Sequence, residues 1–151
     1  MENYKSKTGI VSKAPFELYM SFVDMRNFSQ MLPEDKRDMV EADYDTITVS
    51  AQGFSIGAKV NQRVPYSYIE LIDWGNSPIA FKVGLNFGAA GPADKTQFSI
   101  EVSADLNFMM KMMLGKKIQE GLDKIVDGLV AVSEGRMPEG VDPEMLKNMK
   151  M

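Results

Sequence analysis

The sequence predicts an α+β domain in which an antiparallel sheet packs against one long C-terminal helix. Residues 37–106 form short runs of alternating apolar and polar side chains separated by turn residues, a pattern typical of antiparallel strands with one wet face. Residues 107–133 instead carry apolar side chains at helical spacing. An amphipathic helix that follows many strands needs a sheet to cover its apolar side.

The helix over residues 107–133 is the longest predicted element. Asp105 and Asn107 are suitable N-caps, and Gly135 with Pro138 is typical of a helix end. At 100° per residue, one side of the helix is apolar and we expect it to face the sheet. That side carries Leu114, Ile118, Leu122, Ile125, Leu129 and Val132.

The N-terminal part predicts one strand and two short helices. The strand covers residues 3–12 and its inward side chains are Tyr4, Ser6, Thr8 and Ile10. Pro15 opens the first helix, whose inward residues are Leu18, Tyr19 and Phe22. Asp24 caps the second helix, residues 25–31, with Phe28 and Leu32 inward and Pro33 as its stop.

The sheet region contains candidate strands at residues 37–42, 46–51, 54–64, 66–74, 79–87 and 95–104. Alternation assigns one face of each strand to the interior. The bulky inward side chains are Tyr4, Phe54, Trp74, Phe81, Phe87 and Phe98, and the inward polar ones are Ser6, Thr8 and Gln62.

Composition excludes several function classes. The chain has 151 residues, enough for one domain with a sizeable core, and its net charge is −4 without a basic run, which argues against nucleic-acid binding. Cysteine and histidine are absent, so we expect no disulfide, no metal site and no cofactor. No run is long enough to span a membrane and no signal peptide is evident, so we expect the cytoplasm.

Several short motifs, in this order and at this spacing, resemble the START-like superfamily, also called SRPBCC or helix-grip proteins. The matching stretches are residues 14–19 (APFELY) with Asp24 and Leu32-Pro33, residues 77–81 (SPIAF), Lys95-Thr96, and residues 104–107 (ADLN) leading into the methionine-rich helix. The resemblance is greatest to the bacterial polyketide cyclase/dehydrase and lipid-transport branch and to the proteins that carbon monoxide dehydrogenase has as its G-type subunit.

The resemblance spans residues 1–133 and leaves residues 134–151 as a C-terminal tail that carries a possible short helix. It implies a seven-stranded antiparallel sheet curled around the long helix, with an apolar cavity between them. It does not imply one reaction, because the superfamily includes lipid carriers, receptors, cyclases and chaperone activators.

The main functional hypothesis is that this cavity binds a small hydrophobic molecule, such as a lipid or a polycyclic aromatic compound. The expected ligand-binding residues are Phe22, Phe28, Phe54, Ile56, Gln62, Phe81, Val83, Phe98, Ile100, Met110, Lys111, Leu114 and Ile118. Lys111 is placed at the mouth, where it would meet an anionic head group. The alternative is a solid core in which the aromatic rings fill the space.

A second hypothesis concerns the methionines at the start of the long helix. Met109, Met112 and Met113 lie opposite the apolar side and form an exposed patch. A strand-connecting loop, the tail, a second copy of the chain or a membrane surface would cover it. A partner there would make the protein an accessory or maturation subunit, and a second copy would make it a homodimer.

The third hypothesis is an enzyme of the cyclase or dehydratase type. It requires a carboxylate or a phenol at the cavity, and the candidates are Glu41, Glu70, Tyr66 and Tyr68. Ser6, Thr8 and Ser12 have no histidine to activate them, and residues 88–92 (GAAGP) precede a strand rather than a helix, so they do not form a phosphate loop. We assign no catalytic residue from the sequence.

Overall fold

The computed structural model describes residues 1–30, 34–51, 54–75 and 77–135. Its elements are β1 (Glu2–Lys5), β2 (Gly9–Val11), α1 (Pro15–Phe22), α2 (Arg26–Gln30), the 3₁₀ helix η1 (Glu34–Met39), β3 (Val40–Ala42), β4 (Thr46–Ala51), β5 (Phe54–Val64), β6 (Tyr68–Asp73), β7 (Phe81–Ala89), β8 (Thr96–Ala104) and α3 (Phe108–Ser133).

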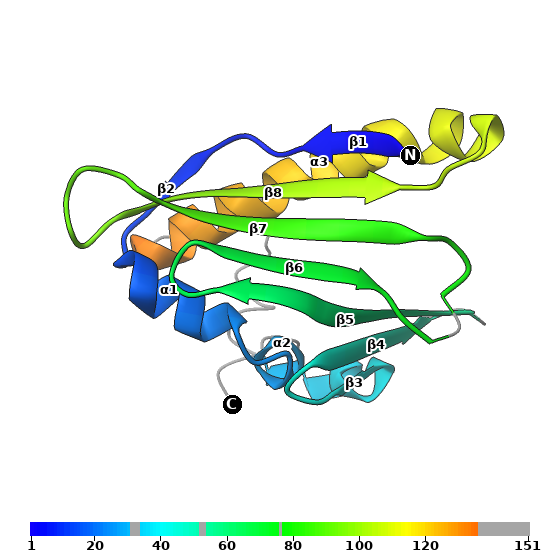
Figure 1. Ribbon diagram of the computed structural model, residues 1–151, viewed down its shortest axis with the longest axis horizontal. Coiled ribbons are helices and arrows are strands. Elements are labelled where there is room, and N and C mark those ends of the chain that lie inside the picture. Colours follow the sequence, from blue (N-terminus) through cyan, green and yellow to red (C-terminus); the bar gives the residue numbers. More distant parts are fainter. Residues whose placement is uncertain (31–33, 52–53, 76, 136–151) are drawn as a thin grey trace.

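All the described strands belong to one antiparallel sheet. Its order is β1-β8-β7-β6-β5-β4-β3, with β2 also paired to β8. Figure 1 shows α3 running across one face of the sheet behind β1, β8 and β7, while α2 lies at the β3–β4 end. The predicted fold class, an α+β helix-grip arrangement, is therefore confirmed.

The predicted first strand is divided, which makes eight strands instead of seven. β1 and β2 pair with successive parts of β8, and Lys5 lies opposite Glu101 while Gly9 lies opposite Phe98. Between them Ser6 is buried, and its hydroxyl accepts a hydrogen bond from the Ile100 amide at 2.8 Å. The irregularity shifts the inner face by one residue, so the inward assignment of Ile10 is wrong and Val11 is buried instead.

Two strand boundaries also differ from the prediction. Residues 37–39 belong to η1, so the strand there begins only at Val40. The chain turns at 64–67, where the Ser67 amide donates to the Val64 carbonyl at 3.0 Å, and β6 starts at Tyr68. Tyr66 takes a φ of +67° in this turn, a conformation usual for glycine. At the other end of β6, Trp74 is exposed, so its inward assignment is wrong.

A β-bulge in β5 changes which side chains face inward. The pairing with β6 shifts register between Val60 and Gln62, so the alternation expected for residues 54–64 fails beyond Val60. Gln62 is exposed, contrary to prediction. Arg63 turns inward instead, and its guanidinium donates to the Val23 carbonyl at 2.8 and 3.1 Å and to the Tyr44 carbonyl at 2.9 Å.

The N-cap of α3 is Asn107, as predicted, and its side chain accepts a hydrogen bond from the Met110 amide at 2.8 Å. The buried face of the helix is centred on Leu122 and Val126, so it is rotated from the predicted line. Leu114, Ile125 and Val132 are exposed, and for them the prediction is wrong.

Contacts with the first two strands explain this rotation. A Cβ on Gly9 would lie 2.6 Å from Val126 Cγ1, so the β2 backbone touches the helix directly. The Lys7 amide donates to Asp123 at 2.7 Å, and the Lys7 ammonium pairs with Asp127 at 2.8 Å. These contacts place α3 against the β1–β2 edge, which leaves its Ile125 side directed toward the space in front of β4 and β5.

Candidate functional site

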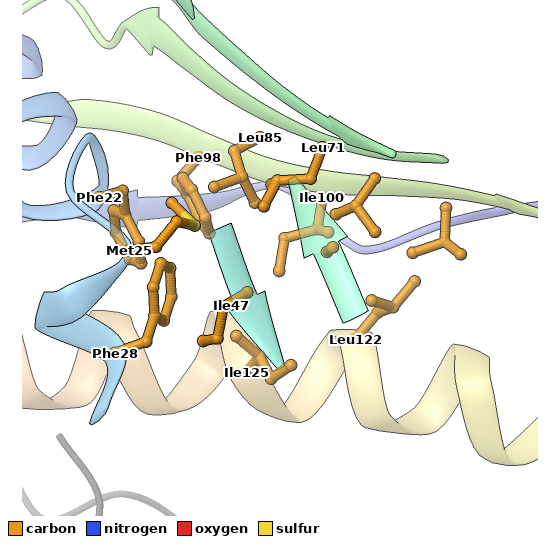
Figure 2. A pocket seen from close by; sticks show the side chains of 13 residues that line it. Phe22, Met25, Phe28, Ile47, Leu71, Leu85, Phe98, Ile100, Leu122 and Ile125 are labelled. Atoms are coloured by element: carbon orange, nitrogen blue, oxygen red, sulfur yellow. The ribbon is translucent and has the colours of Figure 1, made fainter. Parts of the chain in front are cut away.

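An apolar cavity of about 330 Å³ lies between the sheet and α3. Figure 2 shows its lining side chains converging from the sheet, from α1 and α2 and from α3. They are Phe22, Met25, Phe28, Ile47, Ala58, Leu71, Val83, Leu85, Phe98, Ile100, Val102, Leu122 and Ile125. Every lining residue is apolar, so the cavity offers side-chain contacts by dispersion and hydrophobic burial only.

Aromatic rings from α1 and α2 close one end of the cavity. Phe22 stacks on Phe98 of β8 with centroids 5.7 Å apart, and Phe28 lies 5.4 Å from Phe22. Phe87 completes the cluster at 5.5 Å from Phe98. Because the rings pack on one another, they gather at this end instead of filling the middle of the cavity.

Asp24 and Met25 fix this corner of the site. The Asp24 carboxylate accepts a hydrogen bond from the Arg26 amide at 3.0 Å, as expected for the cap of the second helix. The Met25 amide donates to the Tyr44 carbonyl at 3.2 Å, which ties the α1–α2 junction to the start of β4. The side chain of Met25 is fully buried and faces the cavity.

The opposite wall is formed by α3. Leu122 is buried, whereas Ile125 lines the cavity and remains 56% exposed. Ile47 of β4, also a lining residue, is half-buried. A lining side chain with this much exposure means that the cavity opens to solvent beside Ile125.

The structure brings some of the predicted site residues together at this cavity. Those that line it are Phe22, Phe28, Val83, Phe98 and Ile100. Phe81 and Ile118 are half-buried and pack against the core outside the lining. Ile56 and Gln62 are exposed on β5, and the side chain of Phe54 lies outside the described residues.

The remaining predicted site residues lie along the first turns of α3, away from the cavity lining. Met110 is partly buried, and Leu114 is exposed. Lys111 pairs with Glu2 at 3.3 Å, so its ammonium is directed to the β1 edge and not to a cavity mouth. The inner wall is built instead by the next two turns, which carry Leu122 and Ile125.

Sequence reasoning missed several lining residues. Alternation places Ala58 and Leu85 inward but does not assign them to the site, and Leu71 follows from the alternation of β6 once its start is known. No pattern identifies Met25, because it lies between two helices. Ile47 depends on the pairing of β4 with β5, where it lies opposite Ala58.

The polar residues expected in the cavity lie elsewhere. Ser6 is committed to β1 and β8, since its hydroxyl also donates to the Lys7 carbonyl at 2.8 Å. Thr8 and Gln62 are exposed. Within the described part of the chain, no group of three or more carboxylate, histidine or cysteine residues is arranged to hold a metal ion.

None of the four candidate acid–base residues lines the cavity. Glu41 and Tyr66 are exposed. Tyr68 and Glu70 lie on the opposite face of the sheet, because the neighbouring Ile69 and Leu71 point into the core.

Glu70 belongs to a polar network on that outer face. Its carboxylate accepts hydrogen bonds from Asn61 at 2.8 Å and from Tyr68 at 3.2 Å, and Lys82 lies 3.7 Å away. The hydrogen bond from Asn61 is the main reason why the pKa of Glu70 is lowered. Burial and the nearby Glu70 charge raise the pKa of the Tyr68 hydroxyl. The network joins β5, β6 and β7 and accounts for both residues structurally.

The predicted methionine patch is exposed. Met109 and Met112 are each 70% exposed, Met113 is 66% exposed, and the neighbouring Phe108 is 78% exposed. No strand-connecting loop of the described residues covers them. The helix that carries them is not a membrane span: in the described part of the chain, no helix is both long and apolar enough to cross a bilayer.

Solved structures of similar fold share little sequence with this chain. A Thermobifida fusca protein has a TM-score of 0.68 at 9% identity, covering 89% of this chain and 95% of its own. CalU16 from Micromonospora echinospora has a TM-score of 0.52 at 14% identity, covering 95% and 79%. Aha1 from Colwellia psychrerythraea, solved as a dimer, has a TM-score of 0.53 at 13% identity, covering 82% and 97%.

These likenesses support an SRPBCC-like fold and, at such identities, extend to the fold alone. The sequence matches no protein-family model and no curated protein.

Proposed function

We propose that the chain binds a small uncharged apolar molecule, such as a lipid or a polycyclic aromatic compound, in the cavity between the sheet and α3. The observation that carries this proposal is a cavity of about 330 Å³ with only apolar lining residues and an opening beside Ile125. Water gains little there, since it needs two to four polar partners to be held in a protein interior.

The chemistry of the lining defines the ligand. With no lining cation or carboxylate, a charged group would be desolvated without compensation if it entered the cavity. Burial of about 250 Å² of ligand surface contributes about 6 kcal/mol, which corresponds to a dissociation constant on the order of 10 µM. Any polar part of the ligand would remain at the opening, in contact with water.

The test uses a neutral fluorescent probe, N-phenyl-1-naphthylamine, which becomes bright in apolar surroundings. We expect saturable binding of one probe per chain. Ala58→Phe places a ring into the cavity from β5, so it should weaken binding at least tenfold. Ala89→Phe is the matched control, because Ala89 is exposed near the end of β7 and does not line the cavity.

Thermal unfolding of both variants is measured alongside, so that loss of the fold is not taken for loss of binding. Saturable binding that survives in Ala58→Phe, or a wild-type protein that binds no probe, would overturn the proposal.

A further inference from the structure

We propose that the start of α3 is a docking face for an anionic lipid surface. The face consists of Phe108, Met109, Met112, Met113, Lys116 and Lys117, and it is called the methionine–lysine face below. It is separate from the cavity, because none of these residues lines it. The inference therefore goes beyond the proposed function and does not depend on it.

The apolar part of this face is unusual for a protein surface. Four large apolar side chains within six consecutive residues are each at least 66% exposed. Their position is well defined, because the Asn107 cap holds the first turn and the Lys111–Glu2 ion pair ties the second turn to β1. Contiguous exposed apolar surface of this kind marks a binding site.

Helical spacing aligns the apolar and basic side chains. Met109, Met112, Met113 and Lys116 follow the i, i+3, i+4, i+7 pattern, so they share one side of α3. Gly115 lies on the packed side, where an added Cβ would come within 3.0 Å of the Tyr4 hydroxyl oxygen. The stripe consequently points away from the sheet.

Charge distinguishes an anionic partner from other occupants. The chain has a net charge of −4, yet residues 106–119 contain three lysines and neither aspartate nor glutamate. Lys116 has an 88% exposed side chain and only a long contact of 3.9 Å to Glu120. Exposed lysines beside an apolar stripe suit the boundary of an anionic bilayer, where apolar side chains insert while ammonium groups stay at the phosphates.

Two other occupants fit less well. A symmetric contact with a second copy through this stripe would bring the lysines of both chains together, which is unfavourable. The C-terminal residues 136–151 begin at the far end of α3. The distance from there to Met109 is about 39 Å at 1.5 Å per residue, and 16 residues span at most about 58 Å when fully extended. Only the last few of these residues would reach the stripe.

The experiment is co-sedimentation of the full chain with sucrose-loaded vesicles. Vesicles of phosphatidylglycerol and phosphatidylcholine in about a 3:7 ratio are compared with pure phosphatidylcholine. We expect binding to the mixed vesicles that is weakened by salt. Lys116→Glu/Lys117→Glu should reduce the partition coefficient at least 25-fold, since each lysine contributes about fivefold.

The triple variant Met109→Ser/Met112→Ser/Met113→Ser should reduce binding at least tenfold. Its control is Phe16→Ser/Met20→Ser, which removes two exposed apolar side chains of α1 and should bind like the wild type. All variants change exposed residues, and circular dichroism confirms that they fold.

Equal sedimentation with both vesicle types, no sedimentation at all, or wild-type binding by the triple variant would overturn the proposal. Light scattering supplies a further outcome. A wild-type dimer that becomes a monomer in the triple variant, together with absence of vesicle binding, would assign the face to a second copy and would also overturn it.

Discussion

Phe22 of α1 and Phe98 of β8 stack with their ring planes 11° from parallel and their centroids 5.7 Å apart. This contact joins the helical layer to the centre of the sheet and forms the closed end of the cavity. Both residues are buried, and Phe98 is only 1% exposed. The stack therefore serves the fold and the shape of the site together.

Truncation of Phe98 should be strongly destabilising. Phe98→Ala removes a buried ring that contacts both Phe22 and Phe87, so we expect the free energy of unfolding to fall by about 3–5 kcal/mol in urea denaturation. Phe16→Ala on the exposed side of α1 should change it by about 0.5 kcal/mol or less. A similar small loss for Phe98→Ala would show that the stack does not form.

Gly9 should be required for the close packing of β2 on α3. Gly9→Ala places a Cβ 2.6 Å from Val126 Cγ1 and 2.7 Å from Val130 Cγ2, so the helix must shift. We expect a loss of about 1–3 kcal/mol. Gly88→Ala is the control, because its Cβ would meet Gln97 at an ordinary 3.7 Å.

A double-mutant cycle sharpens this test. Val126→Ala removes the methyl groups that obstruct the new Cβ, so Gly9→Ala should cost less in that background. Strictly additive losses would contradict direct contact between the two residues.

Arg63 should act as a clamp between α1, β4 and β5. Its guanidinium donates to the Val23 and Tyr44 carbonyls, pairs with Asp45 at 2.6 Å and lies 4.2 Å from the Tyr44 ring centroid. Arg63→Met leaves the carbonyls without these donors, so we expect the unfolding free energy to fall by about 2–3 kcal/mol.

The planar fork of arginine should matter as well as its charge. Arg63→Lys should recover only part of the loss, because one ammonium cannot reproduce the paired donors. Lys59→Met, at an exposed position of the same strand, is the control and should change little. Full recovery by lysine would mean that charge alone holds this corner.

The outer-face network should make stability depend on acid. The pKa of Glu70 is lowered, chiefly by the Asn61 hydrogen bond. Because its folded-state pKa lies below the unfolded one, the ionised carboxylate stabilises the fold above the ordinary glutamate pKa of 4.5, and this contribution is lost as pH falls through the lower folded value.

A carboxyl-detected NMR titration measures the pKa of Glu70 directly. Asn61→Ala should move the pKa upward, and the variant should lose less stability on acidification below about pH 4.5 than the wild type. An unchanged pKa in Asn61→Ala would remove the assigned cause.

The sequence predicted the fold class because it depends on periodicity, and periodicity is visible in β7, β8 and α3. The capping roles of Asp24 and Asn107 were also predicted, since a side-chain cap is a local interaction. The local errors occurred where the chain leaves regular geometry. The break after Ser6, the bulge before Gln62 and the turn at Tyr66 each displace the alternation, and none has a clear signal in the sequence.

The candidate site was predicted in part for a similar reason. Phe98 and Ile100 follow from the alternation of β8, whereas Leu122 and Ile125 depend on how α3 is rotated and placed along the sheet. Contacts of α3 with Gly9 and Lys7 determine that placement, and they join residues more than one hundred positions apart. A helical wheel contains no information about such partners.

The most direct test of the proposed binding site is a set of intermolecular NOEs between N-phenyl-1-naphthylamine and the methyl groups of the protein. We expect NOEs to Ile47, Leu71, Val83, Leu122 and Ile125, whose side chains line the cavity. NOEs confined to Met109, Met112 and Met113, or none to any lining methyl at saturating probe, would contradict binding between the sheet and α3.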